Sequence, residues 1–127
     1  MKAKDIMIGD WVYNPFTRKK LRLTFGRDID FAEELYLEPI PLTAEILEKN
    51  GFMKHDFGHI EGQHKWSWWR DTGTFVSLWC RELADDPGDG WMVRIDSSDA
   101  TCCCRVESVH ELQHALRLCG IEKEVEL

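Results

Sequence analysis

Short stretches near the N-terminus alternate between apolar and polar side chains. The alternation runs over residues 21–25 and again over 35–38, which is the period of a half-buried β-strand. An earlier strand over 11–13 ends where Asn14 and Pro15 break the apolar run. Three short strands so close together predict a small curled sheet of the SH3-like kind.

The first helical signal begins at Thr43, whose hydroxyl suits the N-cap position of a helix. Glu45 lies in the first turn, where the helix dipole favours an anion. Leu42 and Leu47 have the spacing of a hydrophobic staple across the cap. Gly51 ends the segment, because glycine readily adopts the left-handed conformation that follows many helices.

Residues 57–106 are rich in aromatic and β-branched side chains, which favour strands. Turn signals at 71–73, 85–90 and 97–99 divide this region. We therefore expect an antiparallel meander of about four strands here.

A second helix is expected over residues 108–119. Ser108 and Glu111 form a capping box at its start, and Gly120 follows its end. Its apolar stripe, which should face the core, consists of Val109, Leu112, Leu116 and Cys119. The last residues, 121–127, leave two interpretations open: an added edge strand or a free tail.

Together these elements predict an α+β fold: a small N-terminal SH3-like curled sheet, a helix, an antiparallel meander of about four strands and a C-terminal helix. A chain of 127 residues suits a single compact unit over 1–127. A soft sub-boundary is expected near residue 42, between a barrel-like part (1–42) and an α-β-meander-α part (43–127).

The apolar runs are too short to span a membrane, and the N-terminus lacks the apolar core of a signal peptide. We therefore expect a cytoplasmic protein without a membrane partner.

The number of cysteines is odd, and three of the five are consecutive, which fits reduced thiols better than a disulfide framework. They are Cys80, Cys102, Cys103, Cys104 and Cys119.

The net charge of −7 is unevenly placed along the chain. Residues 1–42 hold seven basic and seven acidic side chains, whereas residues 43–127 hold nine basic and sixteen acidic ones. An acidic surface repels phosphate backbones, so nucleic acid is disfavoured as a partner. A weaker alternative is nucleic-acid binding through the N-terminal basic cluster, which consists of Arg18, Lys19, Lys20 and Arg22.

Residues 110–114 read His-Glu-Leu-Gln-His, which is the H-E-x-x-H pattern of zinc peptidases. On a helix, His110 and His114 share one face, so both imidazoles could hold one zinc ion while Glu111 acts as the base for a bound water. The position of the apolar stripe turns both histidines away from the core, toward solvent.

A third zinc ligand is not evident. Hydrolytic zinc needs three protein ligands, and only thirteen residues follow His114. An upstream ligand such as His55, His59 or His64 has no spacing to support it, and Glu111 already has a structural role in the capping box. The preferred interpretation has no catalytic residue, no metal ligand and no cofactor. The alternative is a minimal zinc peptidase built on the H-E-x-x-H residues.

Trp66 and Trp68 share one face of an expected strand. Six tryptophans in a chain of this size more often build a bulky core. Exposed aromatic side chains, however, mark partner sites. Trp66 and Trp68 are therefore the candidate binding residues.

Three segments of the chain resemble a family of small uncharacterised proteins encoded by prophages and mobile elements of gut Bacteroidales. The segments are KDIMIGDWVY, LEPIPLTAEILEKNGF and VHELQHALRLCGI, and the middle of the chain is not covered. That family has no assigned activity. The resemblance implies a bacterial cytoplasm and an accessory gene.

The leading hypothesis is a non-enzymatic phage or mobile-element accessory protein that acts by binding another protein. Its grounds are the incomplete catalytic set, the acidic second part of the chain and the tryptophan-rich sheet. The sequence does not identify the partner.

Overall fold

The structure, a computed structural model, describes residues 5–24, 26–27, 36–56, 64–69, 74–79, 90–96 and 101–127. It has an α+β fold with a small three-stranded antiparallel sheet, a short helix, a five-stranded antiparallel meander and a C-terminal helix. The fold class predicted from the sequence is confirmed. The meander has one strand more than expected.

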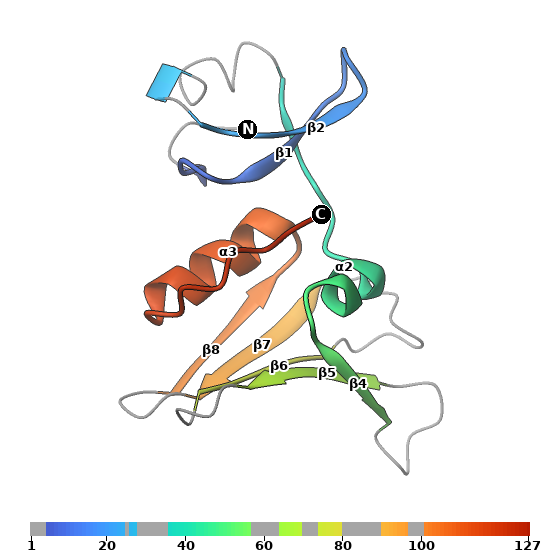
Figure 1. The fold of residues 1–127 in the computed structure, drawn as a ribbon, viewed down its shortest axis with the longest axis vertical. Helices are drawn as coiled ribbons and strands as arrows, with labels where there is room; N and C mark the ends of the chain where they lie inside the picture. The colour runs from blue at the N-terminus through green and yellow to red at the C-terminus, as the bar shows by residue number, and fades with distance from the viewer. Residues whose placement is uncertain are drawn as a thin grey trace.

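The small sheet consists of β1 (Trp11–Asn14), β2 (Lys19–Arg22) and β3 (Glu38–Pro39), in the spatial order β2-β1-β3 (Figure 1). Because β1 is the central strand, the turn that follows it lies close to the residues that precede β3. The sheet has its own small core, made of Ile6, Val12, Leu23 and Leu37.

The large sheet is a meander in which each strand pairs with the next along the chain. Its strands are β4 (Met53–Asp56), β5 (His64–Trp69), β6 (Phe75–Trp79), β7 (Trp91–Asp96) and β8 (Thr101–Val106). The last four are those expected in the region 57–106. β4 was not expected, because its sequence MKHD has no apolar repeat. It forms because pairing with β5 satisfies its backbone hydrogen-bonding groups.

Two helices pack on one face of the large sheet, α2 (Ala44–Lys49) and α3 (Val109–Leu118) (Figure 1). Thr43 and Ser108 are their N-caps, as the sequence predicted. Each cap hydroxyl accepts a backbone N–H from the first turn of its helix at 3.4 Å.

Both helices end at a glycine in the left-handed conformation, Gly51 (φ 86°) and Gly120 (φ 74°). The residue after each glycine, Phe52 or Ile121, donates its N–H back to the last turn of its helix, at 3.0 and 2.9 Å respectively. This Schellman geometry folds both apolar side chains onto the core, where they are buried.

The main core lies between the large sheet and the two helices. Its fully buried side chains include Leu47, Val76, Leu78, Trp91, Val93, Ile95, Leu112 and Leu116. Val109, Leu112 and Leu116 are buried, so the apolar stripe predicted for the second helix is confirmed. The indole N–H of Trp91 donates to the carbonyl of Leu42 at 2.9 Å, which ties the sheet to the segment that joins β3 to α2.

The C-terminal segment, residues 121–127, is neither an edge strand nor a free tail. The Gln113 side-chain amide accepts the N–H of Val125 at 2.7 Å and donates to the carbonyl of Lys123 at 2.9 Å. The Asn50 side-chain amide likewise accepts the N–H of Glu126 and donates to the carbonyl of Glu126, both at 2.7 Å. Two side chains thus supply the hydrogen bonds that a partner strand would make.

α3 lies between the two sheets (Figure 1). It contacts β8 of the large sheet and β1 of the small one, and Pro41 forms an isolated β-bridge with Ser108 just before the helix.

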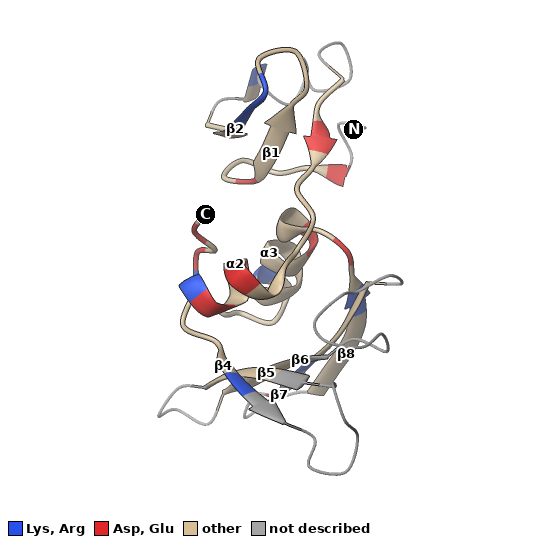
Figure 2. Ribbon diagram, turned by 90° about the vertical axis from the view of Figure 1, so that its right-hand side faces the viewer, with Lys and Arg blue, Asp and Glu red and all other residues tan. Residues whose placement is uncertain are grey.

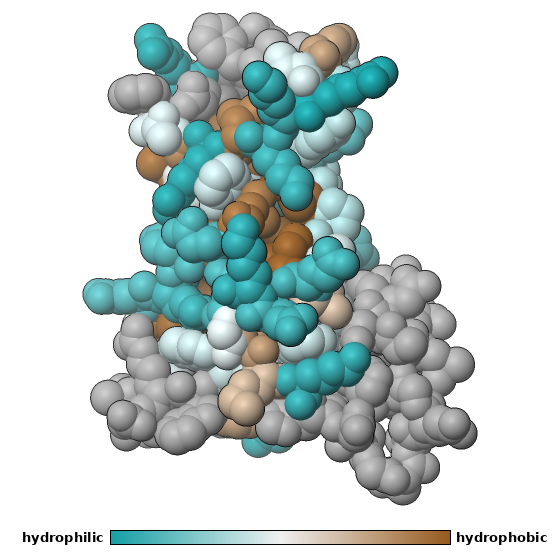
Figure 3. Space-filling view, turned by 45° about the vertical axis from the view of Figure 1, so that its right-hand side comes forward, coloured by the Kyte–Doolittle hydropathy of each residue, from teal (hydrophilic) through white to brown (hydrophobic). Residues whose placement is uncertain are grey.

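Basic residues lie on β2 and acidic ones on α2 (Figure 2). On the face shown in Figure 3, the described residues are mostly hydrophilic, and apolar residues reach the surface in the middle of the view. Among the described residues, helices of the length and hydropathy needed to cross a membrane are not found.

Candidate functional site

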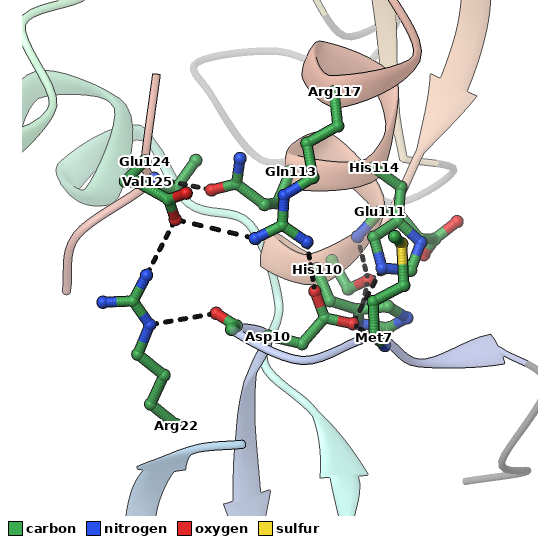
Figure 4. Close-up of polar contacts among 12 residues, drawn as sticks. Met7, Asp10, Arg22, His110, Glu111, Gln113, His114, Arg117, Glu124 and Val125 are labelled. Carbon is green, nitrogen blue, oxygen red and sulfur yellow. Dashed lines mark hydrogen bonds and ion pairs between the residues drawn. The ribbon is translucent and has the colours of Figure 1, made fainter. Parts of the chain in front are cut away.

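The small sheet covers the face of α3 that carries the H-E-x-x-H residues (Figure 4). His110 is only 6% exposed, and the side chain of His114 is 22% exposed. The expectation that both histidines face solvent is therefore wrong. The apolar stripe of α3 does face the large sheet, but the opposite side of the helix packs against β1 and the turn before it. The periodicity of a single helix does not reveal such a second neighbour.

His110 and Glu111 are both engaged by the N-cap residue. Ser108 Oγ donates to Glu111 Oε1 at 2.8 Å and lies 3.0 Å from His110 Nδ1. Because the single hydroxyl hydrogen goes to the carboxylate, Nδ1 of His110 is the donor in its contact with Ser108. Burial lowers the pKa of His110, so the imidazole is uncharged at neutral pH.

Asp10 places a carboxylate against the middle of this helix face. Its side chain is fully buried, and its Oδ2 accepts the N–H of Met7 at 2.7 Å. The same oxygen lies 2.7 Å from His114 Nε2, and Arg117 Nη1 lies 3.5 Å from Oδ1. A buried carboxylate needs hydrogen bonds or an opposite charge. α3 supplies a hydrogen-bond partner through His114 and an opposite charge through Arg117, which lies about one helical turn further along.

Glu124 extends this network to the C-terminal segment. Its Oε2 lies 2.8 Å from Arg22 Nη2 and 3.6 Å from Arg117 Nη2. Arg22 also donates through Nε to the carbonyl of Gly9 at 3.1 Å. Because Glu124 is half-exposed, each of its ion pairs contributes little by itself. Together they join the small sheet, α3 and the C-terminal segment.

The geometry does not present the H-E-x-x-H side chains as a zinc site. The rings of His110 and His114 are 5.5 Å apart at 75°, and Nε2 of His114 is engaged by Asp10. Glu111, the base in the peptidase alternative, is held by Ser108. Within the described part of the chain, no three His, Cys, Asp or Glu side chains are grouped as metal ligands. Of the three side chains considered as a third ligand, His59 lies outside the described residues. His55 and His64 lie on β4 and β5, where the structure describes the backbone but not these two side chains.

Sequence reasoning missed Asp10 and Arg117. A signal for Arg117 was present, because it follows His110 and His114 at the i, i+4, i+7 spacing of one helix face. Nothing in the sequence marked Asp10 as the partner of that face, since it lies 104 residues from His114.

Trp66 and Trp68 do not form an exposed platform. Trp66 is 3% exposed in the main core, and Trp68 is half-buried against that core. The ring of Trp68 lies 6.5 Å from that of Phe52, and the ammonium group of Lys123 lies 5.1 Å from its centroid. The large sheet turns both tryptophans toward the helices.

A different aromatic pair is exposed on the small sheet. Phe16 and Tyr36 are 71% and 69% exposed, with ring centroids 6.4 Å apart. Arg18 (φ 56°) and Tyr36 (φ 49°) are the non-glycine residues with positive φ in the described part of the chain, and both lie here. This pair was not among the residues predicted from the sequence. The available signal was the turn at Asn14 and Pro15, which places Phe16 at the end of a hairpin.

Comparisons with protein-family models, curated proteins and solved structures gave no match. Two features of the described residues therefore bear on function: the buried junction on α3 and the exposed aromatic pair on the small sheet.

Proposed function

We propose that this chain acts by binding another protein, and that the exposed end of its small sheet docks on an acidic surface of that partner. The observation that carries the proposal is the Phe16–Tyr36 pair, whose rings are 6.4 Å apart and mostly exposed. Neither side chain belongs to a core cluster of the described residues. Large aromatic side chains bury much area at little entropic cost and often dominate the energy of protein interfaces.

The backbone around the pair supports the same proposal. A left-handed conformation at a non-glycine residue costs about 1–2 kcal/mol, and Arg18 and Tyr36 both adopt it. Such strain is often kept where it positions functional side chains. Asn14 Oδ1 accepts the N–H groups of Phe16 at 3.0 Å and Thr17 at 3.3 Å, which holds the turn in the shape that presents Phe16.

The charges beside the pair indicate the chemistry of the partner. Arg18, Lys19 and Lys20 are exposed in the turn and at the start of β2. Basic side chains beside an aromatic anchor attract an acidic surface and increase the rate of association. The excess of acidic residues lies in the other part of the chain, so this end is the one that an acidic partner would approach.

Single-stranded nucleic acid is the second ligand that aromatic and cationic side chains could bind. The net charge of −7 opposes it, because the rest of the molecule repels phosphates. The protein-binding role is also the one proposed for a phage or mobile-element accessory protein, which the sequence resemblance implied. The zinc peptidase gains no support from the geometry of His110, Glu111 and His114.

The test begins with a photo-reactive phenylalanine analogue at position 16 of the full chain, expressed in bacterial cells. The same analogue at Met53, which is 62% exposed on β4, is the matched control. We expect one acidic protein to cross-link from position 16 and not from position 53. That protein is then purified, and its affinity is measured by titration calorimetry.

The calorimetry compares the wild type with two double variants. Phe16→Ala/Tyr36→Ala should weaken binding by about 30-fold or more, as expected for interface anchors worth about 2 kcal/mol. Lys19→Glu/Lys20→Glu should also weaken it and reduce its dependence on salt. Unchanged affinity in both variants would overturn the proposal. So would tighter binding to a labelled single-stranded oligonucleotide than to the cross-linked protein.

A further inference from the structure

Three thiols gather between β8 and the end of α3. Cys102 and Cys104 lie on the face of β8 that packs against the main core, and Cys119, the C-cap residue of α3, packs against the same core. The Cys102 side chain is within hydrogen-bonding reach of both Cys104 and Cys119. Cys103 lies on the opposite face of the strand and is exposed, and these four cysteines are free thiols.

Among these thiols, Cys102 and Cys119 are the pair that two different elements bring within hydrogen-bonding reach of each other. Cys102 and Cys104 are two residues apart in one strand, so their Cα atoms are separated by about 6.6 Å and their side chains run parallel. That separation is at the upper end of the range that disulfides allow. Cys103 points away from both. Cys119 instead approaches Cys102 from a facing element.

A hollow beside these thiols provides access. It has a volume of about 250 Å³ and is lined by Cys102 and Cys104 from β8 and by Ala115 and Leu118 from α3, among others. Leu118 is 88% exposed. A small thiol reagent can therefore approach Cys102 and Cys104 through the hollow, and Cys119 is itself partly exposed at the end of α3.

We propose that Cys102 and Cys119 form a redox modification site, reduced in the resting protein and converted to a disulfide by a small disulfide such as oxidised glutathione. The thiolate of one cysteine attacks a glutathione sulfur, forming a mixed disulfide and releasing one reduced glutathione. The second thiolate then attacks the sulfur of the first cysteine, displaces the other glutathione and closes the protein disulfide. The two protein thiols lose two protons and two electrons, which convert one oxidised glutathione into two reduced ones.

The surroundings of the thiols make this reaction slow at neutral pH. Burial raises the pKa of Cys119, and proximity to Cys102 raises it further. Since the thiolate is the form that attacks, the rate of disulfide formation should increase with pH. Once formed, the bond would close the segment 102–119 and fix α3 to the edge strand β8.

The experiment incubates the purified full chain with oxidised glutathione at about pH 8, near the pKa of a free thiol. Unreduced peptide mapping by mass spectrometry should find a Cys102–Cys119 linked peptide, lighter by two hydrogen atoms than its separate parts. The thermal midpoint should rise on oxidation and return on reduction. Cys103→Ser is the matched control, because it removes an adjacent exposed thiol, and it should form the same disulfide to the same extent.

Cys102→Ser and Cys119→Ser should each abolish the linked peptide and the rise in midpoint. The wild-type map decides the question by itself if either variant fails to fold. The proposal is overturned if another cysteine pairs with Cys102 or Cys119 in their place. It is also overturned if glutathione modifies Cys103 while Cys102 and Cys119 both stay reduced.

Discussion

Asp10 Oδ2 and His114 Nε2 lie 2.7 Å apart, although 104 residues separate them in the chain. The contact joins the small sheet to the helix that also covers the large sheet. It places a fully buried carboxylate between an imidazole and the guanidinium of Arg117. The histidine that resembles a zinc ligand in the sequence thus contributes to the packing of the fold.

Removing the carboxylate tests this junction. Asp10→Ala should lower the free energy of unfolding by about 2–3 kcal/mol, because it breaks charge-assisted hydrogen bonds and leaves Arg117 and His114 without their buried partner. Urea unfolding followed by circular dichroism measures the change. Glu38→Ala, at an exposed glutamate on β3 of the same small sheet, is the control and should stay within about 0.5 kcal/mol of the wild type. Equal losses in the two variants would contradict the assigned role of Asp10.

The buried His110 predicts a loss of stability in mild acid. Burial lowers its pKa in the folded state below the value of about 6.5 in the unfolded chain. The unfolded state therefore binds the proton more readily, and stability falls as the pH drops through the unfolded-state pKa toward the folded-state one. Relative to His110→Gln, the wild type should lose free energy of unfolding between about pH 7 and pH 5. If the difference in free energy of unfolding between the two proteins stayed constant over that range, the assigned role of His110 would be wrong.

The apolar stripe of α3 offers a paired test of packing. Leu112 is completely buried, so Leu112→Ala should cost about 2–4 kcal/mol through lost contacts and a residual cavity. Leu118, in the same helix, is 88% exposed, and Leu118→Ala should change the stability by less than about 0.5 kcal/mol. Denaturant unfolding of both variants measures the contrast. A loss below about 0.5 kcal/mol for Leu112→Ala would show that the stripe is not packed.

The amide of Gln113 should control the order of the C-terminal segment. Gln113→Ala removes the acceptor of the Val125 N–H and the donor to the Lys123 carbonyl. We expect the Val125 amide to lose hydrogen-exchange protection, with a stability loss of about 1–3 kcal/mol. Asn50→Ala is the companion variant and should first expose the Glu126 amide, which Asn50 holds. Unchanged protection of Val125 in Gln113→Ala would refute this role.

Metal analysis separates the binding protein from the peptidase alternative. We expect the purified protein to hold no stoichiometric zinc, because Nε2 of His114 is committed to Asp10 and Ser108 holds Glu111. Elemental analysis after dialysis without chelator measures this. Stoichiometric zinc that is lost in both His110→Ala and His114→Ala, with peptidase activity abolished by Glu111→Gln, would restore the alternative.

Local features of the fold could be predicted from the sequence. The caps at Thr43 and Ser108, the glycine stops and the stripe on α3 all depend on neighbours within a few residues, so short-range spacing is enough to find them. β4 was missed because the strand state of MKHD depends on pairing with β5. The sequence does not decide the state of the C-terminal segment, because its hydrogen-bond partners are side chains outside the segment, Asn50 and Gln113.

The sequence by itself determined the α+β class, the order of the main elements and the face of α3 that is buried against the large sheet. These follow from side-chain periodicity and capping, which act locally along the chain. Only the tertiary structure decided what covers the other face of α3 and which aromatic side chains stay exposed. A contact such as Asp10–His114, or the meeting of Phe16 with Tyr36, arises when sheets and helices pack. Packing joins residues that no local spacing relates.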